Sequence, residues 1–126
     1  MSLETFTDAY IETLLWSETN DDCEPLDEEY TADDITEESM ESVKSDCHRF
    51  YDKFNDTWQD KYLRSNEYSD DEYAGYDFLL TRNGHGAGFW DGDWEEPIAT
   101  QLTERSKEFG ETNLLVGDDG KLYVYP

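Results

Sequence analysis

The first 43 residues contain fifteen acidic side chains and no Lys or Arg. Over the whole chain, 33 acids face nine Lys and Arg residues, which gives a formal net charge of -24. Like charges on one compact body repel each other, so the fold must keep nearly all of these groups in water. Aromatic residues make up 15% of the 126 positions and can supply a core that offsets the repulsion. A single acidic domain over residues 1–126 is therefore expected.

This charge excludes some partners and favours others. No basic patch is available to meet phosphates, which argues against direct binding to nucleic acid or to an anionic membrane. The chain has no apolar run of about 18 residues and no N-terminal segment of the signal type, so a cytoplasmic location is expected. The charge favours a basic partner, such as a protein that itself binds nucleic acid. Solubility in high salt is the alternative explanation.

Apolar residues at helical spacing predict three helices, over residues 3–16, 37–63 and 97–109. The second has the longest apolar stripe, and Thr36 before it is a suitable N-cap. Two acidic segments, near 17–35 and 65–75, are expected to be loops. Leu26 and Tyr30 are the expected anchors of the first loop.

Short apolar segments with turn residues between them predict two hairpins. The first pairs residues 76–82 with 88–91 around Asn83-Gly84, and the second pairs 113–116 with 121–125 around an Asp-Gly turn. Together they would form a mainly antiparallel sheet of about four strands. Packing three helices on this sheet gives a two-layer domain of the α+β class.

Two of the predicted helices carry carboxylates at every fourth position, a step of about 6 Å along the axis. Successive phosphates of a nucleic-acid strand have a similar spacing. We therefore expect these rows, with acids of the 17–35 segment, to imitate phosphates on a surface that binds a basic protein. The alternative is that they are ordinary solvated helix faces. The residues assigned to this surface are Glu4, Asp8, Glu12, Asp21, Asp22, Glu28, Glu29, Asp33, Asp34, Asp52, Asp56 and Asp60.

The Gly-rich turn after residue 82 contains a histidine, which suggests two interpretations. With Asp91, Asp93 or Arg82 as partners, His85 would be the centre of a small enzyme or of a ligand- or metal-binding domain. The simpler interpretation is a rigid turn followed by an aromatic anchor, in which the glycines permit unusual backbone angles. We favour this structural motif, which comprises Asn83, Gly84, His85, Gly86, Gly88, Trp90 and Asp91.

Metal and cofactor motifs are absent from the sequence. Neither the acidic turn at 91–93 nor the one at 118–120 continues as a calcium-binding loop. Cys23, Cys47 and His48 lack the spacing of a zinc site, and no cofactor is predicted. The aromatic group Phe89, Trp90 and Trp94 is expected to lie mainly in the core, with an exposed recognition patch as the alternative.

The stretch at residues 76–94, YDFLLTRNGHGAGFWDGDW, is followed by LTERSKEFG and LLVGDDGKLYVY. These segments, and the N-terminal stretch at 13–50, resemble a family of small acidic proteins encoded by bacteriophages. The resemblance covers most of the chain. It implies expression inside an infected bacterial cell and a host-directed interaction, and it implies no catalytic residue.

The leading hypothesis from the sequence is a non-enzymatic, nucleic-acid-mimicking inhibitor of a basic host protein. The alternatives are the small enzyme or ligand-binding domain centred on His85, and a structural phage protein that is acidic only for solubility.

Overall fold

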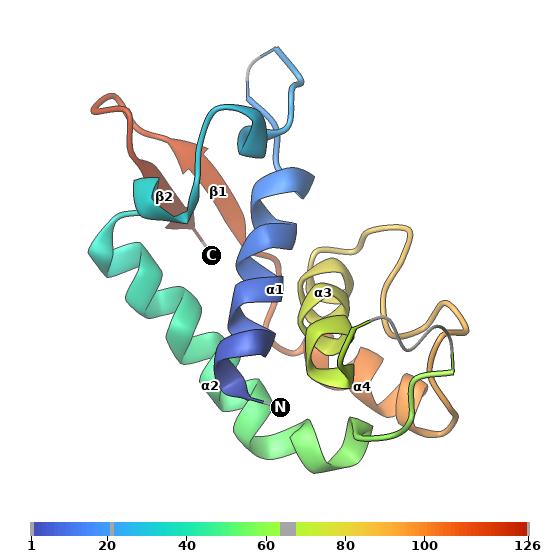
Figure 1. Cartoon of the computed structure of the whole chain (residues 1–126). Coiled ribbons are helices and arrows are strands. Elements are labelled where there is room, and N and C mark those ends of the chain that lie inside the picture. Colours follow the sequence, from blue (N-terminus) through green and yellow to red (C-terminus); the bar gives the residue numbers. More distant parts are fainter. Residues whose placement is uncertain (1, 21, 64–67, 126) are drawn as a thin grey trace.

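The computed structural model describes residues 2–20, 22–63 and 68–125 (Figure 1). Within these ranges the chain forms four α-helices, two short 3-10 helices and one antiparallel pair of strands. The elements in chain order are α1 (Leu3–Ser17), η1 (Leu26–Glu28), η2 (Ala32–Asp34), α2 (Glu37–Trp58), α3 (Asp70–Arg82), α4 (Ile98–Lys107), β1 (Asn113–Val116) and β2 (Leu122–Tyr125).

Helix α1 is surrounded by the other elements. It packs against α2, α3, both 3-10 helices and β1 (Figure 1). Ser2 caps its start by accepting a hydrogen bond from the Thr5 amide at 3.1 Å. Because neighbours cover α1 on most sides, its exposed positions form a single row at every fourth residue. That row consists of Glu4, Asp8, Glu12 and Trp16.

Helix α2 brings an aromatic stripe into the core, as its periodicity predicts. Thr36 caps the helix by accepting from the Ser39 amide at 3.2 Å. Phe50 stacks on Phe78 of α3 with ring centroids 4.1 Å apart and nearly parallel rings. Leu26 is also buried, which confirms one predicted anchor of the 17–35 segment. Tyr30, the other, packs at the edge of the core.

The predicted end of this helix, at residue 63, is wrong, because α2 stops at Trp58. The side chains at its end bind the start of α3 instead of continuing the helix. The Trp58 indole and the Gln59 amide donate to the Asp71 carboxylate at 2.9 and 2.7 Å. The Asp60 amide donates to the Asp70 carboxylate at 2.6 Å.

The prediction of a loop to residue 75 and a strand over 76–82 is also wrong, because Asp70–Arg82 is a helix. Ser69 starts α3 by accepting from the Glu72 amide at 3.2 Å. The core surrounds α3 so fully that apolar residues occupy several of its faces. A helix buried on all sides lacks an amphipathic pattern, and its Phe78-Leu79-Leu80 run resembles a strand.

Asn83 and Gly84 end this helix rather than turn a hairpin. The amides of Gly84 and His85 donate to the carbonyls of Thr81 and Leu80 at 3.1 and 3.0 Å. This is the Schellman arrangement, which requires a left-handed residue, and Gly84 has φ of 71°. The predicted return strand at 88–91 is a series of turns and bends.

The predicted four-stranded sheet with three helices is therefore contradicted. The described residues contain four α-helices and a two-stranded sheet. The C-terminal hairpin is confirmed, with Asn113 opposite Tyr125 and Val116 opposite Leu122. Helix α4 is also confirmed, although it spans Ile98–Lys107 and not the whole predicted range 97–109.

Gly75 permits α1 and α3 to cross closely. A Cβ atom added at this position would lie 2.3 Å from the Phe6 carbonyl oxygen and 2.9 Å from the Ala9 Cβ. Both neighbours belong to the rigid face of a packed helix, so the backbones could not remain at this distance. A side chain at residue 75 would force the two central helices apart.

We predict that Gly75→Ala lowers the free energy of unfolding by about 1–3 kcal/mol, because overpacking outweighs the gain in helix propensity. Urea denaturation followed by circular dichroism measures the change. Gly86→Ala is the matched control, since nothing lies within 4 Å of the added Cβ. Equal stability of the two variants would contradict the close crossing.

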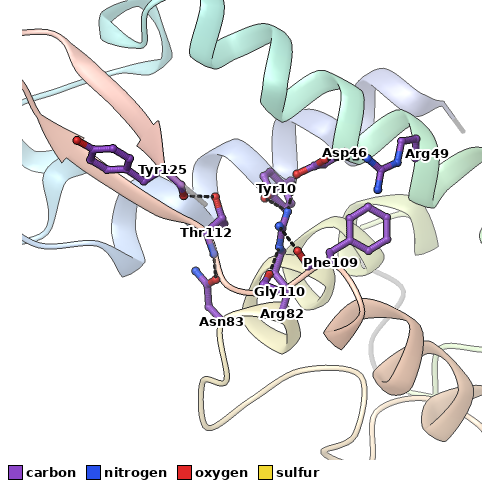
Figure 2. A network of polar contacts seen from close by, with 9 residues as sticks. All are labelled: Tyr10, Asp46, Arg49, Arg82, Asn83, Phe109, Gly110, Thr112 and Tyr125. Carbon is purple, nitrogen blue, oxygen red and sulfur yellow. Dashed lines mark hydrogen bonds and ion pairs between the residues drawn. The ribbon is translucent and has the colours of Figure 1, made fainter.

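A buried arginine at the end of α3 joins three helices and the segment after α4 (Figure 2). The Arg82 side chain is 4% exposed. Its Nη1 donates to the Tyr10 hydroxyl of α1 at 3.0 Å and to the Asp46 carboxylate of α2 at 2.9 Å. Its Nε and Nη2 donate to the carbonyls of Gly110 and Phe109 at 2.8 and 3.1 Å. The guanidinium charge is thus buried with partners for all three nitrogens.

We predict that Arg82→Ala lowers the free energy of unfolding by about 3–5 kcal/mol, because it leaves buried acceptors without a donor. Arg82→Lys should recover only part of the loss, since an ammonium cannot reproduce the planar arrangement of donors. Arg105→Ala is the control. Arg105 forms an exposed ion pair with Glu108, and its loss should cost less than about 1 kcal/mol. Similar losses for Arg82→Ala and Arg105→Ala would argue against a structural role for the network.

Candidate functional site

The acidic row of α1 borders a groove between α1 and α2. Glu4 and Asp8 line one wall, and Lys44 and His48 of α2 lie on the other. Glu4, Asp8 and Glu12 are all exposed, so the predicted row reaches solvent along its full length. Trp16, 45% exposed, continues the row toward the 17–35 segment. An exposed indole beside carboxylates can pack on the alkyl stems of Lys or Arg from a partner.

The acidic row of α2 does not join that of α1 into one surface. Asp52 lines a different groove, between α2 and α4, beside Arg49, Lys53 and Arg105. Lys44 and His48 occupy the α1 side of α2. Asp56 is exposed, but Asp60 lies beyond the helix end with φ of 65° and does not continue the helical spacing. The structure therefore separates the two rows, with basic side chains beside each of them.

The 17–35 segment carries most of its predicted acids outward. Asp22, Glu28, Glu29 and Asp33 are exposed, whereas Asp34 is half-buried. Asp34 accepts a hydrogen bond from the Thr31 amide at 2.8 Å and helps to cap η2, so part of its role is structural. Asp21 lies outside the described residues.

The segment is held beside the end of α1. Thr19 forms a bridge with Pro25, and Leu26 is buried against α1. Ile35 forms a parallel bridge with Leu122 at the far end of the segment. These contacts place the exposed acids next to the C-terminal end of the α1 row, which makes the region spanning Glu4 to Asp34 one continuous acidic part of the chain. We call this region, α1 and residues 17–35, the acidic half-surface.

Two of the proposed catalytic partners of His85 form other contacts. Arg82 points into the core, where all its donors are engaged (Figure 2). Asp91 accepts from the Gly88 amide at 3.4 Å. Burial raises the pKa of Glu18 in the 17–35 segment, and the nearby His85 partly opposes this shift. The geometry of the turn is that of a helix end and a packed loop.

The other motif residues have structural contacts. The Asn83 side chain accepts from the Thr112 amide at 2.8 Å and connects α3 to the hairpin (Figure 2). The Phe89 amide donates to the Thr81 hydroxyl at 3.0 Å, directly after Gly88. Gly86 is exposed. Of the three aromatic side chains, Phe89 and Trp94 are buried as expected, and Trp90 is 51% exposed.

A buried aspartate in α3 is a feature that the sequence interpretation missed. Asp77 is 8% exposed and accepts a hydrogen bond from the Trp94 indole at 2.6 Å. The pKa of Asp77 is raised from 3.8 to about 7, mainly by burial and also by the charges of Asp91 and Asp93, against the opposing effect of the Trp94 hydrogen bond. Burial also raises the pKa of Asp91. The signal in the sequence is an acid beside an apolar run, six residues after another buried acid, Asp71.

The described residues contain no group of three or more His, Cys, Asp or Glu side chains placed to hold a metal ion. In the same part of the chain, no helix has the length and apolar character needed to cross a membrane. No family model, curated protein or solved structure matches this chain.

We predict that Asp77→Asn is more stable than the parent protein, and increasingly so as the pH rises. A carboxyl whose pKa is raised by folding stabilises the fold fully below its unfolded pKa of 3.8, and this contribution is lost as the pH approaches about 7. The asparagine keeps an acceptor for Trp94 and does not ionise. Its advantage in free energy of unfolding should therefore grow by about 2.5 kcal/mol between pH 5 and pH 8.

Urea denaturation at both pH values measures this difference. Asp56→Asn, which removes an exposed charge from α2, should show an advantage that changes by less than about 0.5 kcal/mol. An equal pH trend in the two variants would mean that Asp77 is ionised in the folded protein at pH 5.

Proposed function

We propose that the protein is a non-enzymatic binding protein that presents the acidic half-surface to a basic partner. The partner class is a host protein that binds nucleic acid, and the protein competes with DNA or RNA for its basic surface. The observation that carries this proposal is the side-chain composition of the acidic half-surface. Its exposed charged groups are carboxylates, and the chain has no Lys or Arg before Lys44.

The position of α1 in the fold supports this proposal independently of the amino-acid composition. Neighbouring elements cover α1 on most sides, and the exposed face that remains is a row of carboxylates ending in an exposed Trp. Like charges four residues apart on a helix repel by a few tenths of a kcal/mol per pair. A Lys in the row would relieve this repulsion, so the row is not the arrangement that favours helix stability. A basic partner would remove the same repulsion.

The geometry does not favour a binding surface in which the α1 and α2 rows together imitate two rows of phosphates. The rows of α1 and α2 line different grooves, and basic side chains lie in both. The α1 row together with the acids of residues 17–35 is the more continuous surface. The partner would therefore meet one row and a loop, with long-range attraction that steers the two proteins together and weakens as salt rises.

The resemblance to acidic bacteriophage proteins gives this proposal its setting. It points to a partner inside an infected bacterial cell, where inhibitors of host nucleic-acid-binding proteins would act. Competition follows from the chemistry, because a basic surface occupied by carboxylates is unavailable to phosphates.

The test is capture of host proteins from the heparin-binding fraction of a bacterial lysate on the immobilised protein. At about 50 mM salt we expect capture of a nucleic-acid-binding protein that added DNA duplex or about 0.5 M salt releases. The triple variant Glu4→Gln, Asp8→Asn, Glu12→Gln should reduce capture about tenfold or more. Its control removes three charges elsewhere, through Glu95→Gln, Glu104→Gln and Glu111→Gln, and should reduce capture less than about twofold.

The same variants separate binding from solubility. Circular dichroism should show that the α1 triple variant is folded, and slightly more stable since the row no longer repels itself. Unchanged capture by this variant, or equal losses in the two triple variants, would count against the acidic half-surface as the binding site. Failure to capture any nucleic-acid-binding protein at low salt would count against the proposed function itself.

A further inference from the structure

The outer edge of strand β1 has backbone groups that point away from the sheet. The Gly117 amide donates to the Lys121 carbonyl at 2.7 Å, next to the paired strands. In an antiparallel pair the hydrogen-bonded positions alternate. The backbone N–H and C=O groups of Leu115 and Asn113 therefore also point toward β2. The backbone groups of Leu114 and Val116 therefore point to the opposite side, at the outer edge of β1.

The outer edge of β2 shows the same alternation but is occupied. The Leu122 carbonyl accepts from the Thr36 amide at 3.0 Å, and the Val124 amide donates to the Ser39 hydroxyl at 2.9 Å. At the outer edge of β1, the Leu114 amide faces the Glu18 carboxylate. Burial raises the pKa of Glu18, and this amide lowers it.

The other outward groups of β1 are the Leu114 carbonyl and both backbone groups of Val116. Over the described ranges 2–20, 22–63 and 68–125, no protein group forms a hydrogen bond with these three. An unpaired strand edge of this kind is a template for another extended chain.

A groove of about 430 Å³ runs along this edge, between β1 and the 17–35 segment. Thr19, Asn20, Asp22, Glu29 and Tyr30 form the wall opposite to the strand. Figure 1 shows the 17–35 segment crossing the end of α1 beside the hairpin. One wall of the groove thus has three backbone groups without a partner among the described residues, and the other wall has two carboxylates.

We propose that an extended, basic segment of the partner adds to the outer edge of β1 as a third, antiparallel strand. This inference rests on the proposed function and specifies where and how the acidic half-surface holds its partner. The free groups of Val116 form one pair of backbone hydrogen bonds, and the Leu114 carbonyl accepts a third. Asp22 and Glu29 bind Lys or Arg side chains of the segment, and Glu18 adds a third carboxylate where the edge meets α1.

Charge identifies the occupant of the groove. A second copy of this chain also carries a net charge of -24, and edge-to-edge pairing would bring two acidic walls together. A basic segment neutralises the same carboxylates. Side chains on one face of the added strand would meet the exposed Leu115, so alternating basic and apolar residues fit the edge best.

The probe is a fluorescently labelled peptide, acetyl-KVKVKVK-amide, whose affinity is measured by anisotropy at about 50 mM salt. Two further peptides carry N-methyl groups on alternate residues, one on the Lys residues and one on the Val residues. Methylation keeps the charge but removes the amide donors along one edge of the extended peptide. One methylated peptide should bind about tenfold more weakly, and the other should bind within about twofold of the parent peptide.

Protein variants test the two walls of the groove separately, first the strand edge and then the carboxylates opposite to it. Val116→Pro removes an outward amide and leaves the β1–β2 ladder intact, as proline is tolerated at such edge positions. It should weaken peptide binding about tenfold, whereas Val116→Thr should leave it within about twofold. Asp22→Asn with Glu29→Gln should also weaken binding, and the control Glu104→Gln with Glu111→Gln should change it little. Peptide binding should slow hydrogen exchange at the Val116 amide.

The outcomes separate this inference from the proposed function. Salt-dependent binding that is equal for all three peptides and for Val116→Pro would overturn strand addition and leave acidic binding intact. A lack of binding by any peptide at 50 mM salt would overturn both. Self-association of the parent protein that Val116→Pro abolishes would show that a second copy occupies the edge, which would also overturn the proposal. The peptide series decides the question even if Val116→Pro fails to fold.

Discussion

The fold depends on a buried arginine in a chain that is otherwise rich in negative charge. The Arg82 guanidinium binds α1 through Tyr10, α2 through Asp46, and the segment after α4 through two carbonyls. It also lies over the rings of Phe78 and Phe109, 5.7 and 5.5 Å from their centroids. A cation surrounded by acceptors and aromatic faces is favoured where the surrounding potential is negative. The net charge of the protein thus supports the burial of this one group.

Two buried acids illustrate how differently the core accepts negative charge. Asp71 is fully buried and accepts from Trp58, Gln59 and Tyr51, so three donors surround its carboxylate. Asp77 lies six residues further on and has one indole donor, with other acids close by. The first arrangement joins the end of α2 to the start of α3, whereas the second holds the 91–94 turn against α3. Both positions are structural, and the exposed acids remain available for a partner.

The sequence predicts well those elements that have one solvent-exposed face. Helices α1 and α2 each alternate between core and solvent, and their apolar residues recur at the helical period. The final hairpin is indicated by the turn residues between its two apolar segments. Helix α3 does not alternate, because α1, α4 and the loops cover it, and Gly75 within it suggests a break. The Ser69-Asp70-Asp71-Glu72 capping sequence was the local signal for its start, and it was available without the structure.

The candidate site was predictable in composition but not in arrangement. The acids of residues 3–35 could be identified by counting, because no base interrupts them. Their separation from the α2 row depends on the side of α2 to which Lys44 and His48 turn, which is a tertiary feature. The hairpin register turns the backbone groups of Leu114 and Val116 outward at the edge of β1. Thr36 and Ser39 occupy the opposite edge, that of β2. Local sequence patterns do not indicate these long-range contacts.

The central position of α1 has a consequence for how the chain folds during synthesis. The helix is synthesised before α3, some 60 residues later in the chain, which is one of its main packing partners. The apolar surface that packs on α3 must therefore stay in water until that helix has been made, which slows folding and exposes the nascent chain to aggregation. The carboxylates along its length keep this waiting segment soluble. The same row that we assign to partner binding thus also protects the chain before it has a fold.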